Sequence, residues 1–119
     1  MDRVKEAMFA MLEPLVDTVV VDLFAGTGAL GLEALSRGAQ HVIFVEKSRN
    51  AAKIIQKNIN LLRAHESCSL VVASTTTALP KITGDICFLG PPYPLSDEYD
   101  ITLSALGNRH PDIVIAQHA

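Results

Sequence analysis

Residues 19–31 decide the fold, and they read VVVDLFAGTGALG. The first six form an apolar run rich in β-branched residues, which is typical of a buried strand. Gly26, Gly28 and Gly31 then complete a GxGxxG pattern that opens a predicted helix over residues 28–36. Such glycines let the backbone turn tightly and approach a ligand, while the helix start offers free N–H groups. The pattern alone is shared by many nucleotide binders, so the residues around it must identify the ligand.

The rest of the chain alternates strands with helices. Further strands are predicted over residues 41–45, 70–73, 85–89 and 113–116. Helices are predicted from Asp2 to about Leu15, from Ser48 to Leu62 and over 96–106, with a helical turn over 78–82. This alternation implies right-handed βαβ units. We predict one α/β domain over residues 1–119, with a Rossmann-like parallel sheet of order 3-2-1-4-5 and helices on both faces. Its ligand would lie beyond the carboxyl ends of the strands, at the switch point between strands 1 and 4.

Composition and charge narrow the class of protein. The 119 residues are 49% hydrophobic and 19% charged, which suits a sheet covered on both faces. No apolar run could cross a bilayer, and no signal peptide opens the chain. Cys68 and Cys87 lack a near partner and a His at metal-ligand spacing, so reduced thiols and no metal site are expected. We therefore expect a cytoplasmic protein with no membrane partner.

The net charge of −3 weighs mildly against a nucleic-acid binder, because phosphate neutralisation needs basic residues. A local cluster of basic residues can still bind nucleic acid in a protein whose net charge is negative. Arg49, Lys53 and Lys57 recur at i, i+4 and i+8 on a predicted helix, and the simpler interpretation is a solvated helix face.

Two carboxylates sharpen the choice of ligand. Asp22 immediately precedes the glycine turn, where a carboxylate would repel the pyrophosphate of a dinucleotide. S-adenosylmethionine brings a sulfonium and an ammonium group, which a carboxylate favours. Glu46 ends strand 2, where an acidic side chain accepts hydrogen bonds from both ribose hydroxyls. Two simpler interpretations stay open: Asp22 merely bonds loop amides, and Glu46 is a chance surface residue.

Four segments carry a family resemblance: residues 2–9 (DRVKEAMF), 22–38, 45–47 (VEK) and 88–93 (FLGPPY). Together they resemble the RsmD family, bacterial methyltransferases that modify a guanine exocyclic amine, N2, in 16S ribosomal RNA. The resemblance covers nearly the whole chain in the same order. It implies a class I methyltransferase fold, S-adenosyl-L-methionine as cofactor, and ribosomal RNA or an assembling small ribosomal subunit as partner. Related amino-methylating enzymes share the catalytic motif, so the reaction class is better defined than the base.

The resemblance also assigns the cofactor site. The residues expected to bind the cofactor are Asp22, Phe24, Gly26, Thr27, Gly28, Glu46 and Thr75. Thr75 stands in a loop that usually carries an acidic residue in this family. Its hydroxyl can still bond the adenine, though more weakly than a carboxylate would.

The candidate catalytic residues are Gly90, Pro91, Pro92 and Tyr93, where the family has Asp-Pro-Pro-Tyr or Asp-Pro-Pro-Phe. The resemblance implies that the family's acid and a proline-region carbonyl accept the two N–H bonds of the target amine. Tyr93 would stack on the target base, and Arg3 would meet substrate phosphate unless it is only a helix-end charge. Gly90 has no side-chain acceptor, and losing one such contact commonly costs about 10²–10³ in rate.

Several interpretations of this departure stay open. The chain is a weakened or inactive relative, Asp97 substitutes for the missing acid, or position 90 reflects a cloning or sequencing artefact. A non-catalytic module that binds the cofactor or RNA is the second hypothesis, and an NAD-dependent oxidoreductase is the third. The family fold also continues into a terminal β-hairpin that this chain lacks. We therefore expect an incomplete domain whose exposed edge strand can associate, with its oligomeric state undetermined.

Overall fold

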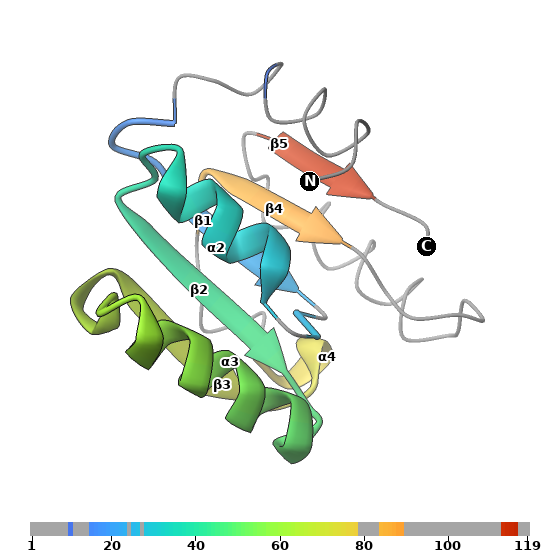
Figure 1. The fold of residues 1–119 in the computed structure, drawn as a ribbon. Coiled ribbons are helices and arrows are strands. Elements are labelled where there is room, and N and C mark those ends of the chain that lie inside the picture. The colour runs from blue at the N-terminus through green and yellow to red at the C-terminus, as the bar shows by residue number, and fades with distance from the viewer. Residues whose placement is uncertain are drawn as a thin grey trace.

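A computed structural model describes residues 10, 15–23, 25–26, 28–78, 84–89 and 113–116. Five strands form one sheet in the order β3-β2-β1-β4-β5, and every neighbouring pair is parallel (Figure 1). The strands are β1 (Val19–Leu23), β2 (His41–Glu46), β3 (Cys68–Val72), β4 (Ile86–Leu89) and β5 (Ile113–Ala116). The predicted strand order is confirmed, and so is the Rossmann-like α/β class.

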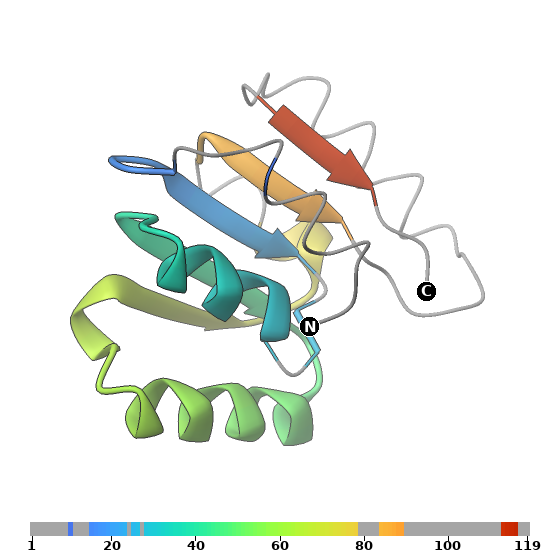
Figure 2. The same cartoon turned by 45° about the horizontal axis from the view of Figure 1, so that its top comes forward.

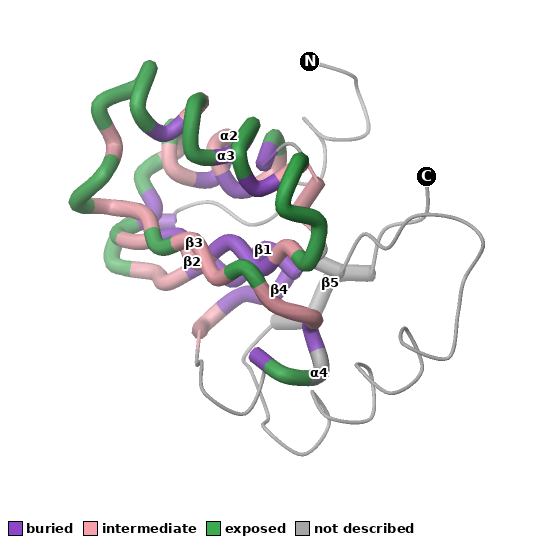
Figure 3. The backbone as a smooth tube through the Cα atoms, turned by 90° about the horizontal axis from the view of Figure 1, so that it is seen from below, coloured by how far each residue is buried: buried purple, intermediate pink, exposed green. Residues whose placement is uncertain are grey.

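Helices lie on both faces of the sheet, as predicted. The helical elements are α2 (Ala29–Ser36), α3 (Arg49–Leu61), the short 3₁₀ helix η1 (His65–Ser67) and α4 (Thr75–Ala78). Helices α2 and α3 cover one face of the sheet, and α4 lies on the other face. Figure 3 shows the sheet edge-on, with these helices on its two sides. None of the helices within the described ranges is long and apolar enough to cross a membrane. The predicted helices at the amino end and over 96–106 fall largely or wholly outside the described residues.

Side-chain capping sets where two of these helices begin. Ser48 accepts the Ala51 N–H at 3.3 Å, so the predicted cap of α3 is confirmed. The short helix after β3 begins earlier than the predicted turn over 78–82. The Ser74 hydroxyl accepts the Thr77 N–H at 3.2 Å, which satisfies a free amide of the first turn and starts α4 at Thr75.

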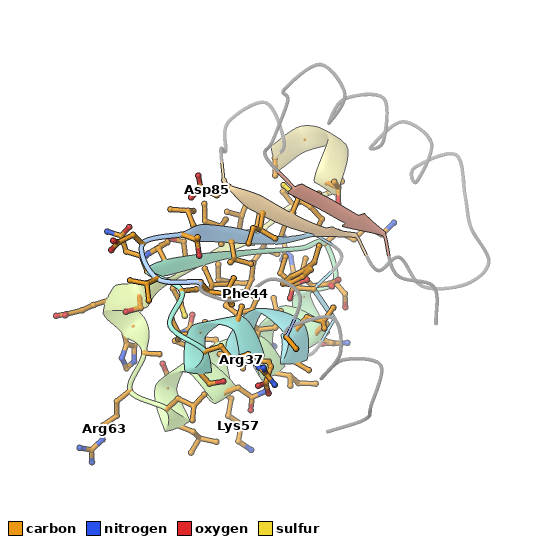
Figure 4. All side chains as sticks on the ribbon, turned by 90° about the horizontal axis from the view of Figure 1, so that it is seen from above. Arg37, Phe44, Lys57, Arg63 and Asp85 are labelled. Carbon is orange, nitrogen blue, oxygen red and sulfur yellow. The ribbon has the colours of Figure 1, made fainter. Side chains whose placement is uncertain are left out.

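The core consists of two layers because the sheet is buried on both sides. Val20 and Phe44 point toward the α2–α3 layer, where they pack with Ile55; Figure 4 labels Phe44 in this position. On the other face, Leu23 and Val45 pack in a cluster that also holds Ala78 and Cys87. Burial on both faces explains why the central strands read as near-continuous apolar runs rather than as alternating patterns.

The parallel register brings the strand ends to one edge. Leu23 pairs with Val45 of β2 and with Leu89 of β4, and Val45 pairs with Val71 of β3. Figure 2 shows the arrowheads of these strands pointing the same way. The segments that follow β1, β2 and β3 therefore start side by side, and they build the candidate site.

Candidate functional site

The glycine turn joins β1 to α2 at this edge. Gly26 and Gly28 have φ of 61° and 84°, in the left-handed region that favours glycine. The Ala25 N–H donates to the carbonyl of Val45 at 3.0 Å, which ties the turn to the end of β2. A Cβ added at Gly26 would meet no described atom within 4 Å, so a ligand can approach the backbone closely there.

Gly31, the third glycine of the pattern, lets α2 pack against β2. A Cβ at this position would lie 2.8 Å from Cγ1 of Val42 and would also collide with the Phe44 ring. The amide of Gly31 therefore sits deep against the sheet, within reach of side chains from β1.

Asp22 uses that amide. Its Oδ2 accepts the Gly31 N–H at 3.0 Å, and the residue is only 2% exposed. Burial raises the pKa of Asp22 to about 7, because a carboxylate without water is costly; nearby Glu46 adds to the rise, and the Gly31 bond opposes it. The contact that the structure describes for Asp22 is thus a backbone amide in the first turn of α2, and not the loop amide that the simpler interpretation of the sequence expected.

Glu46 joins two elements through its two carboxylate oxygens. Oε1 accepts the Gly26 N–H at 2.7 Å, and Oε2 accepts the Ser48 N–H at 2.9 Å. Glu46 therefore holds the glycine turn against the start of α3, which a chance surface residue would not do. A carboxylate can accept about four hydrogen bonds, so both oxygens keep capacity for ligand hydroxyls.

The end of β3 forms the third side of the site. The Ala73 N–H donates to the Glu46 carbonyl at 3.2 Å, which ties the end of β3 to the end of β2. Thr75, predicted to bond the adenine, begins α4 and is only 3% exposed. Its location matches the prediction, and its role toward a ligand stays a prediction.

β4 leads the chain toward the remaining predicted residues. Phe88 pairs with Asp22 and Leu89 pairs with Leu23, so β4 ends beside the glycine turn. Seven predicted site residues and one proposed substitute lie outside the described residues: Arg3, Phe24, Thr27, Gly90, Pro91, Pro92, Tyr93 and Asp97. Within the described ranges, no three His, Cys, Asp or Glu side chains gather to hold a metal ion.

The sequence did not predict which backbone amides donate hydrogen bonds to the two carboxylates. It placed Asp22 and Glu46 at the turn, but it did not pair Asp22 with Gly31 or Glu46 with Gly26 and Ser48. A usable signal was present for one pair: Gly31 is the fourth residue of the predicted helix, within the first turn, where free N–H groups can donate to acidic side chains.

A Rossmann-like sheet with two carboxylates near the ends of β1 and β2, both bonded to amides of the glycine-rich segment, defines a methyltransferase-type fold. Comparison with solved structures supports this fold assignment. The structure is similar to “Putative methyltransferase yhhF” from Escherichia coli, with a TM-score of 0.78 and 35% identity over 91% of this chain and 61% of that one. Residues 1–114 match the family described as Conserved hypothetical protein 95, and the chain belongs to this family, the RsmD family of the sequence resemblance.

Two curated relatives illustrate the match. “Putative rRNA methyltransferase YlbH” of Bacillus subtilis is 39% identical over 98 residues, which are 77% of this chain and 53% of that protein. Ribosomal RNA small subunit methyltransferase D of Escherichia coli K12 is 40% identical over 96 residues, which are 77% and 48% of the two chains. The chain thus spans about half the length of the curated relatives it matches.

Proposed function

We propose that this chain forms the cofactor-binding core of an S-adenosylmethionine-dependent methyltransferase. Its substrate would be an exocyclic amine of an RNA base, N2 of a guanine in 16S ribosomal RNA. Family membership and the relatives' names support the reaction and the RNA. The observation that supports the cofactor is the pair of carboxylates, Asp22 and Glu46, which bond the amides of Gly31 and Gly26 in one glycine-rich segment. A ribosomal substrate would place the protein in the cytoplasm.

The charges at the turn favour a cationic ligand. A dinucleotide would bring its pyrophosphate to the free N–H groups at the start of α2. There the Asp22 carboxyl already accepts the Gly31 N–H, and Glu46 already accepts the Gly26 N–H. A pyrophosphate would lose these donors and face two acidic groups, whereas a sulfonium or ammonium group is attracted by both. This argument disfavours an NAD-dependent oxidoreductase.

The residues also offer the hydrogen bonds that the rest of this cofactor needs. The spare acceptor capacity of Glu46 suits two ribose hydroxyls, and Thr75 marks the edge where adenine would lie. When bound, S-adenosylmethionine supplies an electrophilic methyl group on a positively charged sulfur. The protein's task is then to bind it, orient it and exclude water around the target amine.

At the target base we propose orientation rather than acid–base chemistry as the main effect. A carbonyl of the Pro91–Pro92 region would accept one amine N–H, Tyr93 would stack on the base, and Arg3 would hold a phosphate. In such a transfer the methyl group would pass from the cofactor sulfur to the amine nitrogen, the C–S electron pair would stay on sulfur, and the nitrogen would release its proton to solvent. Gly90 offers no second acceptor, so we propose slow catalysis with cofactor binding retained.

Gly90 is also the observation that favours a second candidate, a non-catalytic relative that still binds the cofactor or RNA. Transfer of a tritiated methyl group to small-subunit ribosomal RNA separates the two. We expect Gly90→Asp to raise the rate by about 10²–10³ and Tyr93→Ala to abolish the gain. Absence of transfer by both the parent chain and Gly90→Asp would support the non-catalytic alternative. A fast parent chain that barely responds to Tyr93→Ala would contradict the proposed target site.

A further inference from the structure

Helix α3 and the residues beside it concentrate positive charge in a chain that is acidic overall. Five of the ten Lys and Arg residues, and none of the thirteen acidic residues, fall between Lys47 and Arg63. On α3 itself, Arg49, Lys53 and Lys57 recur every fourth residue, so they lie along one side of the helix. All three are exposed, and among the described residues none of them has an ion-pair partner.

A groove runs beside this line of cations, between α3 and the edge strand β3. Its first part, about 490 Å³, is lined by Arg49, Ala52, Lys53, Gln56, Leu70 and Val72. An adjoining hollow of about 400 Å³ shares two of these residues and extends the groove; it is lined by Lys53, Gln56, Lys57, Asn60 and Leu61. The apolar wall comes from β3, where Val72 is 49% exposed. Figure 4 shows Lys57 reaching away from the sheet, and Figure 3 shows that much of α3 is exposed.

The groove opens at the same edge as the candidate cofactor site. Val72 pairs in register with Glu46, and Arg49 follows Glu46 by three residues. An RNA strand that leaves the site on this side would therefore meet Arg49 first, then Lys53 and Lys57.

We propose that this groove binds the RNA strand that flanks the target nucleotide, with phosphates on Arg49, Lys53 and Lys57. The inference rests on the proposed function and names a binding surface for its substrate. Four helical residues rise about 6 Å, which is similar to the distance between successive phosphates along a nucleic-acid strand. The apolar wall at Val72 can take a base or ribose between those contacts. An acidic protein would also complement the positive charge of the groove, but its carboxylates do not recur at a regular spacing as the phosphates of an RNA strand do.

The test measures binding of a fluorescein-labelled single-stranded RNA to the full chain as a function of salt. The triple variant R49Q/K53Q/K57Q removes three charges and keeps residues that favour a helix. If all three contact phosphates, the slope of log K against log salt falls by about 2, and affinity falls about tenfold or more at low salt. The swap R49K/K53R/K57R keeps the charges and should retain both values. The single substitution Lys53→Gln is also compared with Arg37→Gln, which removes one charge at the C-cap of α2, outside the residues that line the groove.

Two outcomes overturn the inference. One is an unchanged affinity and salt slope in the triple variant, which would make the cations a solvated helix face. The other is equally tight, equally sensitive binding of polyglutamate, which would indicate an acidic protein partner instead. Titration of the same variants with S-adenosylmethionine distinguishes a failure of the groove proposal from a failure of the proposed methyltransferase function. Cofactor binding without groove-dependent RNA binding removes only this inference, whereas a parent chain that binds no cofactor removes the proposed function.

Discussion

The Glu46 side chain accepts the backbone N–H of Gly26 at 2.7 Å, across a separation of 20 residues. This bond fixes the glycine turn relative to the end of β2. It also puts a carboxylate within reach of any ligand that rests on the turn.

Replacing Glu46 with Gln should weaken cofactor binding while leaving the fold intact. A hydrogen bond to a charged acceptor is worth about 1.5–3 kcal/mol, so S-adenosylmethionine affinity should fall about tenfold to a hundredfold. Titration calorimetry measures the affinity, and thermal unfolding checks the fold. Glu66→Gln is the matched control, because Glu66 is exposed in η1 before the amino end of β3. Equal affinities in the two variants would rule out a ribose contact at Glu46.

The pKa of Asp22 should make folding stability fall as pH rises. The unfolded chain loses this proton near the ordinary value of 3.8, whereas the folded protein holds it until about 7. Between these values the native state binds more protons at Asp22. The contribution of this group to stability is therefore largest below about pH 4 and declines until the folded group has ionised. Urea unfolding across this range should show a flatter profile for Asp22→Asn than for the parent chain. The exposed Asp17→Asn variant should keep the parental slope.

Cofactor binding should lower the pKa of Asp22, whereas burial raises it. A cation near Asp22 favours the ionised carboxyl and lowers its pKa, so binding below about pH 7 should release a proton. The affinity for S-adenosylmethionine should therefore rise with pH up to about 7. Calorimetry in buffers of different ionisation enthalpy counts the released protons. A proton release that Asp22→Asn leaves unchanged would assign it to another group.

Gly31→Ala should destabilise the protein by about 1–3 kcal/mol, because overpacking forces side chains and backbone to move. The new methyl group would press on Val42 and Phe44 and push α2 away from β2. Ser36→Ala changes the exposed last turn of the same helix and should cost less. Denaturant midpoints compare the two, and an equally stable Gly31→Ala would show that α2 can shift without penalty.

Much of the fold was predictable because the local signals agreed with each other. The central strands are buried on both faces, so their apolar runs marked them in the sequence. The glycine pattern and Ser48 marked the starts of α2 and α3. α4 was placed about three residues late, because the cap at Ser74 was not recognised between a short strand and a run of threonines.

The candidate site was predictable in position but not in detail. Asp22 and Glu46 stand at strand ends, which sequence patterns locate well. The burial of Asp22 is different, because it depends on how closely α2 packs on the sheet at Gly31. The groove along α3 needs Leu70 and Val72 beside cations that are about twenty residues away in the chain, and only the folded sheet brings them together.

The central claim is that two carboxylates, Asp22 of β1 and Glu46 of β2, select a positively charged methyl donor at the glycine-rich segment. Titrating the full chain with S-adenosylmethionine and, separately, with NAD tests it most directly. We predict saturable binding of S-adenosylmethionine that weakens in Glu46→Gln, and no measurable binding of NAD. Tight binding of NAD, unaffected by that substitution, would contradict the account.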